Sequence, residues 1–190
     1  FEFRSWLKDI AGTPPTAGDV GGAIADRAAR VDGRVYAPDE TRPDAAPPKP
    51  PRHYETVVDE AALGRWLAAI DAAPLVSFDT ETTSLDPLQA RIVGLSFAVE
   101  PGRACYIPLA HRYPGAPDQL PLDAVLARLA GWFADAARRK LGQNVKYDQH
   151  VLANHGLALA GVAHDTLLES YVLESHKPHD MDSLAWRHLD

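Results

Sequence analysis

Two acidic residues that close an apolar run are the first side chains in this sequence that could do chemistry. The run from Val76 to Phe78 leads into Asp79 and Glu81, two positions apart. If the run is a β-strand, side chains alternate between its faces, so both carboxylates point the same way. Adjacent carboxylates repel unless a cation lies between them, and Mg²⁺ and Mn²⁺ prefer such hard oxygen ligands. The alternative is a strand that runs into a polar turn, which an isolated Asp-x-Glu would favour.

A third acidic residue, Asp148, stands in the run Gly142-Gln-Asn-Val-Lys-Tyr-Asp-Gln. We expect it early in a helix, where the positive end of the helix dipole favours an anion. Asn144 and Tyr147 surround it with hydrogen-bonding groups. Taken alone, Asp148 would only support the start of its helix.

The hydrophobic pattern around these residues predicts strands that alternate with helices. Strands are expected over 54–58, 75–78, 92–99, 104–109 and 140–142, and helices over 60–71, 122–139, 146–154, 165–174 and 182–189. Asp59 and Asp165 stand where each could cap a helix. Strands flanked by helices predict an α/β or α+β sheet with helices packed against it.

Composition narrows the possible classes of protein. The chain has 190 residues, 46% of them hydrophobic, which suffices for one packed domain with an appendage. No apolar run reaches about 18 residues, so no membrane-spanning helix is expected. The single cysteine, Cys105, excludes an internal disulfide and fits a reducing cytoplasm. The net charge of −7 argues against a broad basic surface for duplex DNA.

The first 51 residues differ in composition from the rest. They contain eight of the 16 prolines, which indicates a semi-rigid, extended linker. The chain lacks an initiator Met, so we interpret it as a piece of something longer. A folded domain is expected over 52–190.

The acidic motifs match a known family in their order. Phe78-Asp-Thr-Glu-Thr, followed by Gly142-Gln-Asn-Val-Lys-Tyr-Asp, resembles the first two exonuclease motifs of bacterial DNA polymerase I, in family A. The segments that begin at Gly94, His164 and Asp180 also resemble the proofreading domain of that family. The resemblance runs from about His53 to the last residue. Residues 1–7 resemble the end of the 5′ nuclease domain that precedes it.

The resemblance implies a ribonuclease H-like α/β fold, with a central mixed five-stranded sheet flanked by helices. It implies removal of nucleotides from a DNA 3′ end by hydrolysis, with two Mg²⁺ or Mn²⁺ ions about 3.5–4 Å apart. The implied partners are a single-stranded DNA 3′ end and the polymerase domain of the same parent chain, with no membrane. A monomer in the bacterial cytoplasm, associated with the nucleoid, is expected.

Carried over by position, the resemblance makes Asp79 the ligand that bridges both ions. Glu81 would bind the ion that activates water and orient that water. Asp148 would hold the second ion through water.

Five further positions match contacts to DNA. Thr82 and Leu85 match positions at the terminal nucleotide, with Leu85 as an apolar wedge against a base. The alternatives are turn chemistry for Thr82 and core packing for Leu85. Gln143, Asn144 and Tyr147 match positions along the single-strand path. Stacking against frayed bases tolerates any sequence, as proofreading demands.

The family's third motif, a Tyr followed four positions later by an Asp, is absent from these 190 residues. We therefore expect little or no nuclease activity from the chain alone, although its parent would have it. A basic residue that meets a phosphate is expected near Asp180, where Lys177 and His179 are the candidates.

Three alternatives remain. One is a non-catalytic domain that only braces the polymerase, against which the presence of Asp79, Glu81 and Asp148 speaks. Another is an RNA 3′ exonuclease of the ribonuclease D type, which shares the fold and the Asp-x-Glu start. The third is a binding module without chemistry, in which clustered acids would face a polyanion without reason.

Overall fold

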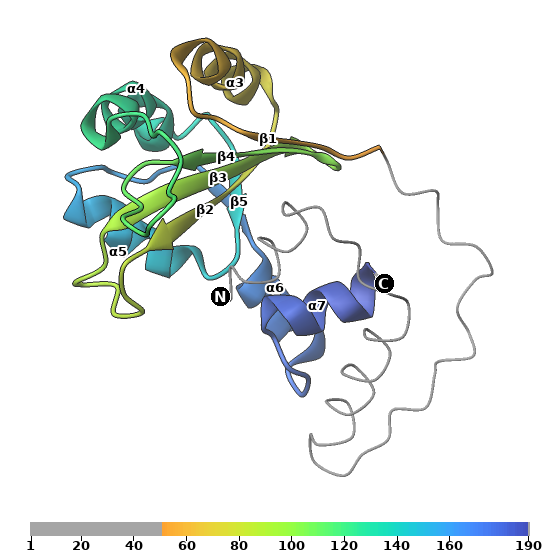
Figure 1. Cartoon of the computed structure of the whole chain (residues 1–190). Coiled ribbons are helices and arrows are strands. Elements are labelled where there is room, and N and C mark those ends of the chain that lie inside the picture. The colour runs from red at the N-terminus through yellow and green to blue at the C-terminus, as the bar shows by residue number, and fades with distance from the viewer. Residues whose placement is uncertain (1–50, 190) are drawn as a thin grey trace, which may run out of the picture. The chain divides into compact units, whose positions relative to one another are not determined.

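A six-stranded mixed sheet organises the computed structural model, which describes residues 51–189 (Figure 1). The strands run in the order β1-β4-β3-β2-β5-β6 across the sheet. Their bounds are β1 (His53–Thr56), β2 (Val76–Thr82), β3 (Ile92–Glu100), β4 (Arg103–Pro108), β5 (Lys140–Gly142) and β6 (Val162–Asp165). The three central strands β2, β3 and β4 are antiparallel, whereas β1, β5 and β6 join by parallel pairing.

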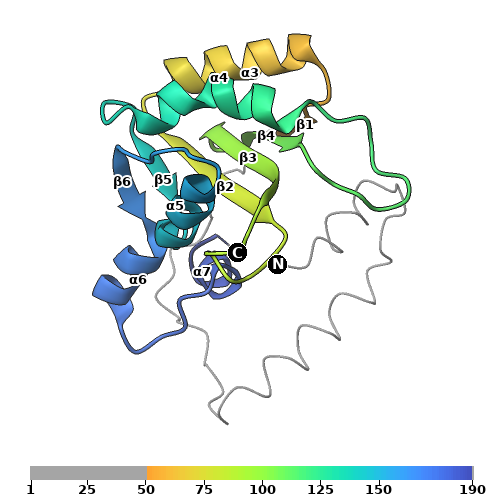
Figure 2. The same ribbon diagram turned by 90° about the vertical axis from the view of Figure 1, so that its left-hand side faces the viewer.

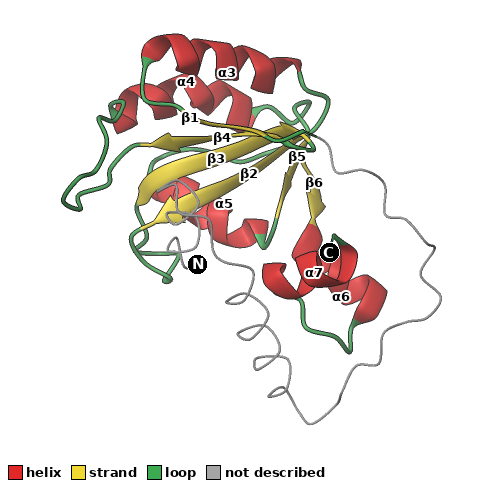
Figure 3. Cartoon of the chain, turned by 45° about the vertical axis from the view of Figure 1, so that its right-hand side comes forward, coloured by secondary structure: helices red, strands yellow, loops and turns green. Residues whose placement is uncertain are grey.

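Helices cover both faces of the sheet. They are α3 (Glu60–Ala72), α4 (Leu122–Ala134), α5 (Val145–Asn154), α6 (Thr166–Glu174) and α7 (Met181–His188). Helices α3 and α4 lie side by side over one face, and α5 packs under the other face near β2 and β5 (Figure 2). Helices α6 and α7 lie beyond the end of β6 (Figure 3). Within residues 51–189, no helix combines the length and the apolar character needed to cross a membrane.

The core lies between the sheet and the pair α3 and α4. Strand β2 buries Val76 and Phe78, and the Phe78 ring meets the Phe133 ring of α4 edge-on at 5.6 Å between centroids. Asp59 caps α3, since its carboxylate accepts a hydrogen bond from the N–H of Ala62. The helix predicted to begin after Asp59 is thus confirmed, with the cap it was expected to have.

Two expectations were wrong in detail. Helix α4 ends at Ala134 instead of residue 139, because the Asp135 carboxylate accepts from the N–H of Ala137 and turns the chain. The buried ammonium of Lys140 then donates to the carbonyls of Asp135 and Arg138, which fixes this turn.

The sheet also has six strands, not the five expected. The additional strand, β6, is a four-residue edge strand with no alternation of apolar and polar residues, so no period-two pattern marks it. The linker and the end of a preceding domain, expected over residues 1–51, lie outside the described residues except for Pro51.

Candidate active site

Strand β2 presents Asp79 and Glu81 on the same face. Burial alternates along the strand, with Phe78 and Thr80 buried and the two acids between and beyond them half-buried. Across the antiparallel pairing, Asp79 lies opposite Ser96 and Glu81 lies opposite Gly94 of β3. The two acids are therefore neighbours on one face, as the strand prediction required.

Asp148 comes from the first turn of α5 and joins the two acids of β2 through Thr80. Its Oδ1 accepts from the Thr80 hydroxyl at 2.6 Å and from the Thr80 N–H at 3.1 Å. This N–H is available because β2 pairs with β5 only through Val76 and Ser77, so the strand edge is open beyond them. Thr80 stands between Asp79 and Glu81 in the chain, and the hydrogen bonds therefore hold a third carboxylate beside the pair.

The turn before α5 fixes where Asp148 lies. Asn144 adopts the left-handed conformation, with φ 58°. The Asp165 carboxylate accepts from the N–H groups of Asn144 and Val145, each at 3.0 Å, and from the N–H of Leu167 in α6. Gly142 leaves no room for a side chain, because a Cβ there would lie 2.8 Å from the Val145 side chain. One carboxylate thus ties together the starts of two helices.

The surroundings of the three acids disfavour their ionised forms. Burial raises the pKa of Asp148 to about 7, and the charge of Asp79 adds to the rise. Burial also raises the pKa of Asp79 and, with help from the Asp79 charge, the pKa of Glu81. Among residues 51–189, no Lys, Arg or His forms an ion pair with any of the three. Three partly desolvated carboxylates that pair with no Lys, Arg or His of this described range are a donor set that a hard divalent cation would stabilise.

The side chains do not form a closed coordination site as they stand. In the described part of the chain, no group of three or more His, Cys, Asp or Glu side chains is arranged to hold a metal ion. Asp148 directs Oδ1 at Thr80, which uses one of its oxygens. The fit to Mg²⁺ or Mn²⁺ therefore rests on the chemistry of the donors, all of them carboxylate oxygens.

The loop after β2 exposes an apolar side chain next to these acids in the chain. Leu85 is 88% exposed, which excludes core packing, the alternative considered for it. The Tyr147 hydroxyl donates to the carbonyl of Ser84 at 2.6 Å and lies 2.5 Å from the Thr82 hydroxyl. The single Thr82 hydroxyl proton is shared between the Tyr147 oxygen and the Ser84 carbonyl at 3.1 Å, so the turn chemistry considered for Thr82 is present too. Tyr147 of α5 thus anchors the loop that carries Leu85.

The other predicted DNA contacts differ in accessibility. Asn144 is exposed, whereas Gln143 is half-buried and tied into the fold. The Gln143 amide donates to the carbonyl of His179 at 2.9 Å, and its oxygen accepts from the Thr166 hydroxyl. His179 is buried, with Nδ1 bonded to the Ser170 hydroxyl at 2.8 Å.

Lys177, the other basic candidate near Asp180, forms an ion pair with Glu174. Both candidates for a phosphate contact are therefore already engaged within the fold.

Sequence reasoning missed Thr80 as a part of this site. The signal was its position in the strand: Thr80 stands between two acids in the sequence, and its own side chain falls on the buried face. A buried hydroxyl needs a hydrogen-bond partner. The partner, Asp148, lies 68 positions later in the chain, which no local pattern shows.

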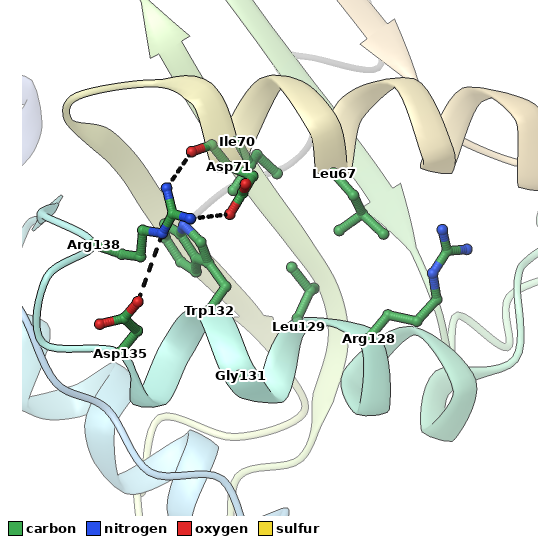
Figure 4. Close-up of a pocket in the computed structure, with 9 residues that line it drawn as sticks. All are labelled: Leu67, Ile70, Asp71, Arg128, Leu129, Gly131, Trp132, Asp135 and Arg138. Atoms are coloured by element: carbon green, nitrogen blue, oxygen red, sulfur yellow. Dashed lines mark hydrogen bonds and ion pairs between the residues drawn. The ribbon is translucent and has the colours of Figure 1, made fainter.

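A hollow of about 290 Å³ lies elsewhere, between α3 and α4 (Figure 4). Arg138 bridges Asp71 and Asp135 at one end of it, at 2.7 and 3.6 Å. The residues that line this hollow do not include Asp79, Glu81 or Asp148. This hollow is therefore separate from the acidic site.

Comparison with known proteins shows which family the chain belongs to. The family model of the 3′-5′ exonuclease domain of DNA polymerase A matches residues 54–190. DNA polymerase I of Pseudomonas aeruginosa is 45% identical over 191 residues, which cover 99% of this chain and 19% of that protein. DNA polymerase I of Synechocystis is 42% identical over 131 residues, 68% of this chain and 13% of that protein. The chain thus spans less than a fifth of the length of these relatives.

The fold of this chain is also similar to those of solved structures. A structure of the POL domain of Pol1 from M. smegmatis, in complex with DNA primer-template and dNTP, has a TM-score of 0.56 at 26% identity. The match covers 70% of this chain and 22% of that one. Trypanosoma brucei RNase D has a TM-score of 0.51 at 16% identity, over 63% of this chain and 40% of that one, which shows the ribonuclease H-like fold alone. The chain therefore belongs to the 3′-5′ exonuclease domain family of DNA polymerase I.

Proposed function

We propose that this chain is the proofreading part of a DNA polymerase I, which removes nucleotides from a DNA 3′ end by phosphodiester hydrolysis. The observation that carries the proposal is the pair of hydrogen bonds from Thr80 to Asp148. They hold a carboxylate of α5 beside the two carboxylates of β2, although the residues are far apart in the sequence. Clustered, desolvated acids beside a polyanionic substrate have a use only if cations join them.

Asp79, Glu81 and Asp148 would hold two Mg²⁺ or Mn²⁺ ions. When bound, such ions supply charge stabilisation at the phosphate and lower the pKa of bound water. The carboxylates contribute oxygen donors, and bound cations would offset the burial and mutual repulsion that raise their pKa values. Glu81 would orient the attacking water.

The loop after β2 and the start of α5 would hold the terminal nucleotide. Leu85 offers an exposed apolar side chain to a base, and Thr82 and Tyr147 fix the loop that presents it. Asn144 would contact the single strand beside them, while Gln143 supports the turn that carries Asn144. Apolar contact of this kind does not depend on base identity, as removal of any mismatched nucleotide requires.

The wider setting is also part of the proposal. The parent would carry a polymerase domain and act as a monomer in the bacterial cytoplasm near the nucleoid. Residues 1–51 would be the end of its 5′ nuclease domain and the Pro-rich linker to this domain. These 190 residues contain no Tyr followed four positions later by Asp, so the chain by itself holds three of the four carboxylates of the family pattern. We expect it to be weakly active or inactive when separated from its parent.

The decisive experiment replaces Asp79 with Asn in the polymerase that contains this chain. Digestion of a 3′-labelled single strand with Mg²⁺ should fall at least about 100-fold, because the central charged ligand is lost. Asp118→Asn, an exposed loop carboxylate, is the matched control and should leave digestion unchanged. Unchanged 3′ removal in Asp79→Asn would support the bracing role instead, and a preference for RNA ends would support the ribonuclease D type.

A further inference from the structure

A buried tyrosine reaches across the sheet toward the acidic pair. Tyr106 of β4 lies opposite Ser96 of β3, which in turn lies opposite Asp79 of β2. Directly opposite residues in antiparallel strands share a face, so Tyr106 rises from the same face as Asp79 and Glu81. Its side chain is only 8% exposed.

Gly94 shows where the Tyr106 hydroxyl lies. A Cβ built on Gly94 would be 1.9 Å from that hydroxyl oxygen, so the phenol occupies the space that a side chain at this position would take. Gly94 lies directly opposite Glu81, and opposite residues place their Cβ atoms about 4.5–5.5 Å apart. The Tyr106 hydroxyl therefore stands within side-chain reach of the Glu81 carboxylate. In agreement, the charge of Glu81 adds to burial in raising the pKa of Tyr106.

A histidine holds the tyrosine from its other side. The Tyr106 hydroxyl meets His111 Nε2 at 2.5 Å. The backbone of His111 is itself fixed by Gln119, whose amide oxygen accepts from the His111 N–H at 2.7 Å and whose NH₂ donates to the His111 carbonyl at 3.0 Å. The loop between β4 and α4 thus anchors the phenol.

We propose that Tyr106, held by His111, is a positioning residue for Glu81. A tyrosine hydroxyl has one proton to donate and can accept in return, so it can donate to a Glu81 oxygen while it accepts from the imidazole. Glu81 has a long side chain with several rotamers, and a fixed hydroxyl within its reach would restrict the directions that the carboxylate takes. The inference rests on the proposed function, because the direction of the Glu81 carboxylate affects the rate only if Glu81 acts in hydrolysis of the 3′ end. It also gives Gly94 a reason to be glycine, since any side chain would displace the phenol.

The kinetic test uses Tyr106→Phe in the polymerase that contains this chain. We expect the kcat for 3′ removal from a labelled single strand to fall about tenfold with KM for DNA unchanged, because Glu81 loses its orientation and the DNA contacts remain. The Mn²⁺ concentration at half-maximal rate should rise several-fold. Tyr113→Phe, at an exposed tyrosine in the loop that carries His111, is the matched control. A wild-type kcat in Tyr106→Phe would overturn the proposal.

A second measurement needs no activity. In the 190-residue chain with ¹³Cζ-labelled tyrosine, the Tyr106 resonance should move in Glu81→Gln and stay in place in Glu100→Gln, whose carboxylate lies at the exposed end of β3. A Tyr106 resonance unmoved by Glu81→Gln would overturn the contact. If the wild-type polymerase removed no nucleotides from a 3′ end, the proposed function would be overturned. The Tyr106 resonance would still decide whether Tyr106 touches Glu81.

Discussion

Thr80 donates two hydrogen bonds to one oxygen of Asp148, at 2.6 Å from its hydroxyl and at 3.1 Å from its N–H. The threonine and the aspartate are both buried, and they join the middle strand of the sheet to the first turn of α5. A buried carboxylate with two donors is held in one orientation. The position of the third acid relative to Asp79 and Glu81 therefore depends on a residue that carries no charge.

Replacing Thr80 with Val tests this dependence. Valine keeps the shape but removes the hydroxyl, so Asp148 keeps only the N–H donor. The free energy of unfolding should fall by about 1–3 kcal/mol, the range for a lost hydrogen bond to a charged or buried group. Exonuclease activity of the polymerase should fall as well, because Asp148 gains freedom to turn.

Thr80→Ser is the matched control for this change, since it keeps the hydroxyl and removes only a methyl group. Urea unfolding of the chain and digestion of a 3′-labelled strand by the polymerase measure the two effects. Equal activity in the valine and serine variants would show that the hydroxyl does not position Asp148.

The raised pKa of Asp148 predicts a pH dependence of stability. The folded-state pKa is about 7 and the ordinary value is 3.8, so the unfolded chain releases this proton first as the pH rises. Ionisation of Asp148 therefore costs stability increasingly from about pH 4 to pH 7, and fully above pH 7. Asp148→Asn avoids this cost and keeps an oxygen that can accept from Thr80. Without metal it should be more stable than the wild type above pH 7, by at most about 4 kcal/mol, and similar near pH 4.

Urea unfolding at a series of pH values, with a chelator present, measures this difference. Added Mn²⁺ at pH 8 should then stabilise the wild type and leave Asp148→Asn nearly unchanged, because a cation offsets the charge. A stability difference that does not vary between pH 4 and pH 8 would contradict the raised pKa.

The sequence predicted the elements that carry the site better than the contacts between them. The shared strand face of Asp79 and Glu81 and the cap at Asp59 follow from local signals, and both were confirmed, although β2 runs to Thr82 and the strand was expected to end at residue 78. The link between Thr80 and Asp148, and the crossing of Tyr106 over Gly94, depend on strand order and register, which no local pattern contains. Edge strand β6 was missed because four residues with no alternation give no signal.

Asp165 provides a test of how the turn before α5 holds the site. Its carboxylate accepts from Asn144, Val145 and Leu167 N–H groups, and so caps α6 and steadies the start of α5. Asp165→Ala should lower the free energy of unfolding by about 1–3 kcal/mol, because three N–H groups, two of them in partly buried hydrogen bonds, lose their acceptor. It should also weaken Mn²⁺ binding measured by calorimetry, because Asp148 follows the same turn.

The matched control is Asp180→Ala. Asp180 caps only α7, through the N–H of Ser183 at 2.9 Å. Its loss should cost about 1 kcal/mol of stability and leave Mn²⁺ binding unchanged. Equal Mn²⁺ affinities in the two variants would mean that Asp165 acts on stability alone.

Replacing Leu85 with Ala tests whether this side chain contributes to DNA binding and not to stability. Because its side chain is 88% exposed, Leu85→Ala should change the free energy of unfolding by less than about 0.5 kcal/mol. If the side chain wedges against the terminal base, removal of a mismatched 3′ nucleotide by the polymerase should slow several-fold, since the truncation removes apolar surface that the base would cover. Leu88→Ala, 70% exposed in the same loop, is the control and should have a smaller effect. Rates measured on single-stranded and mismatched ends would decide the matter: equal rates for the two variants on both substrates would assign Leu85 no part in holding the 3′ end.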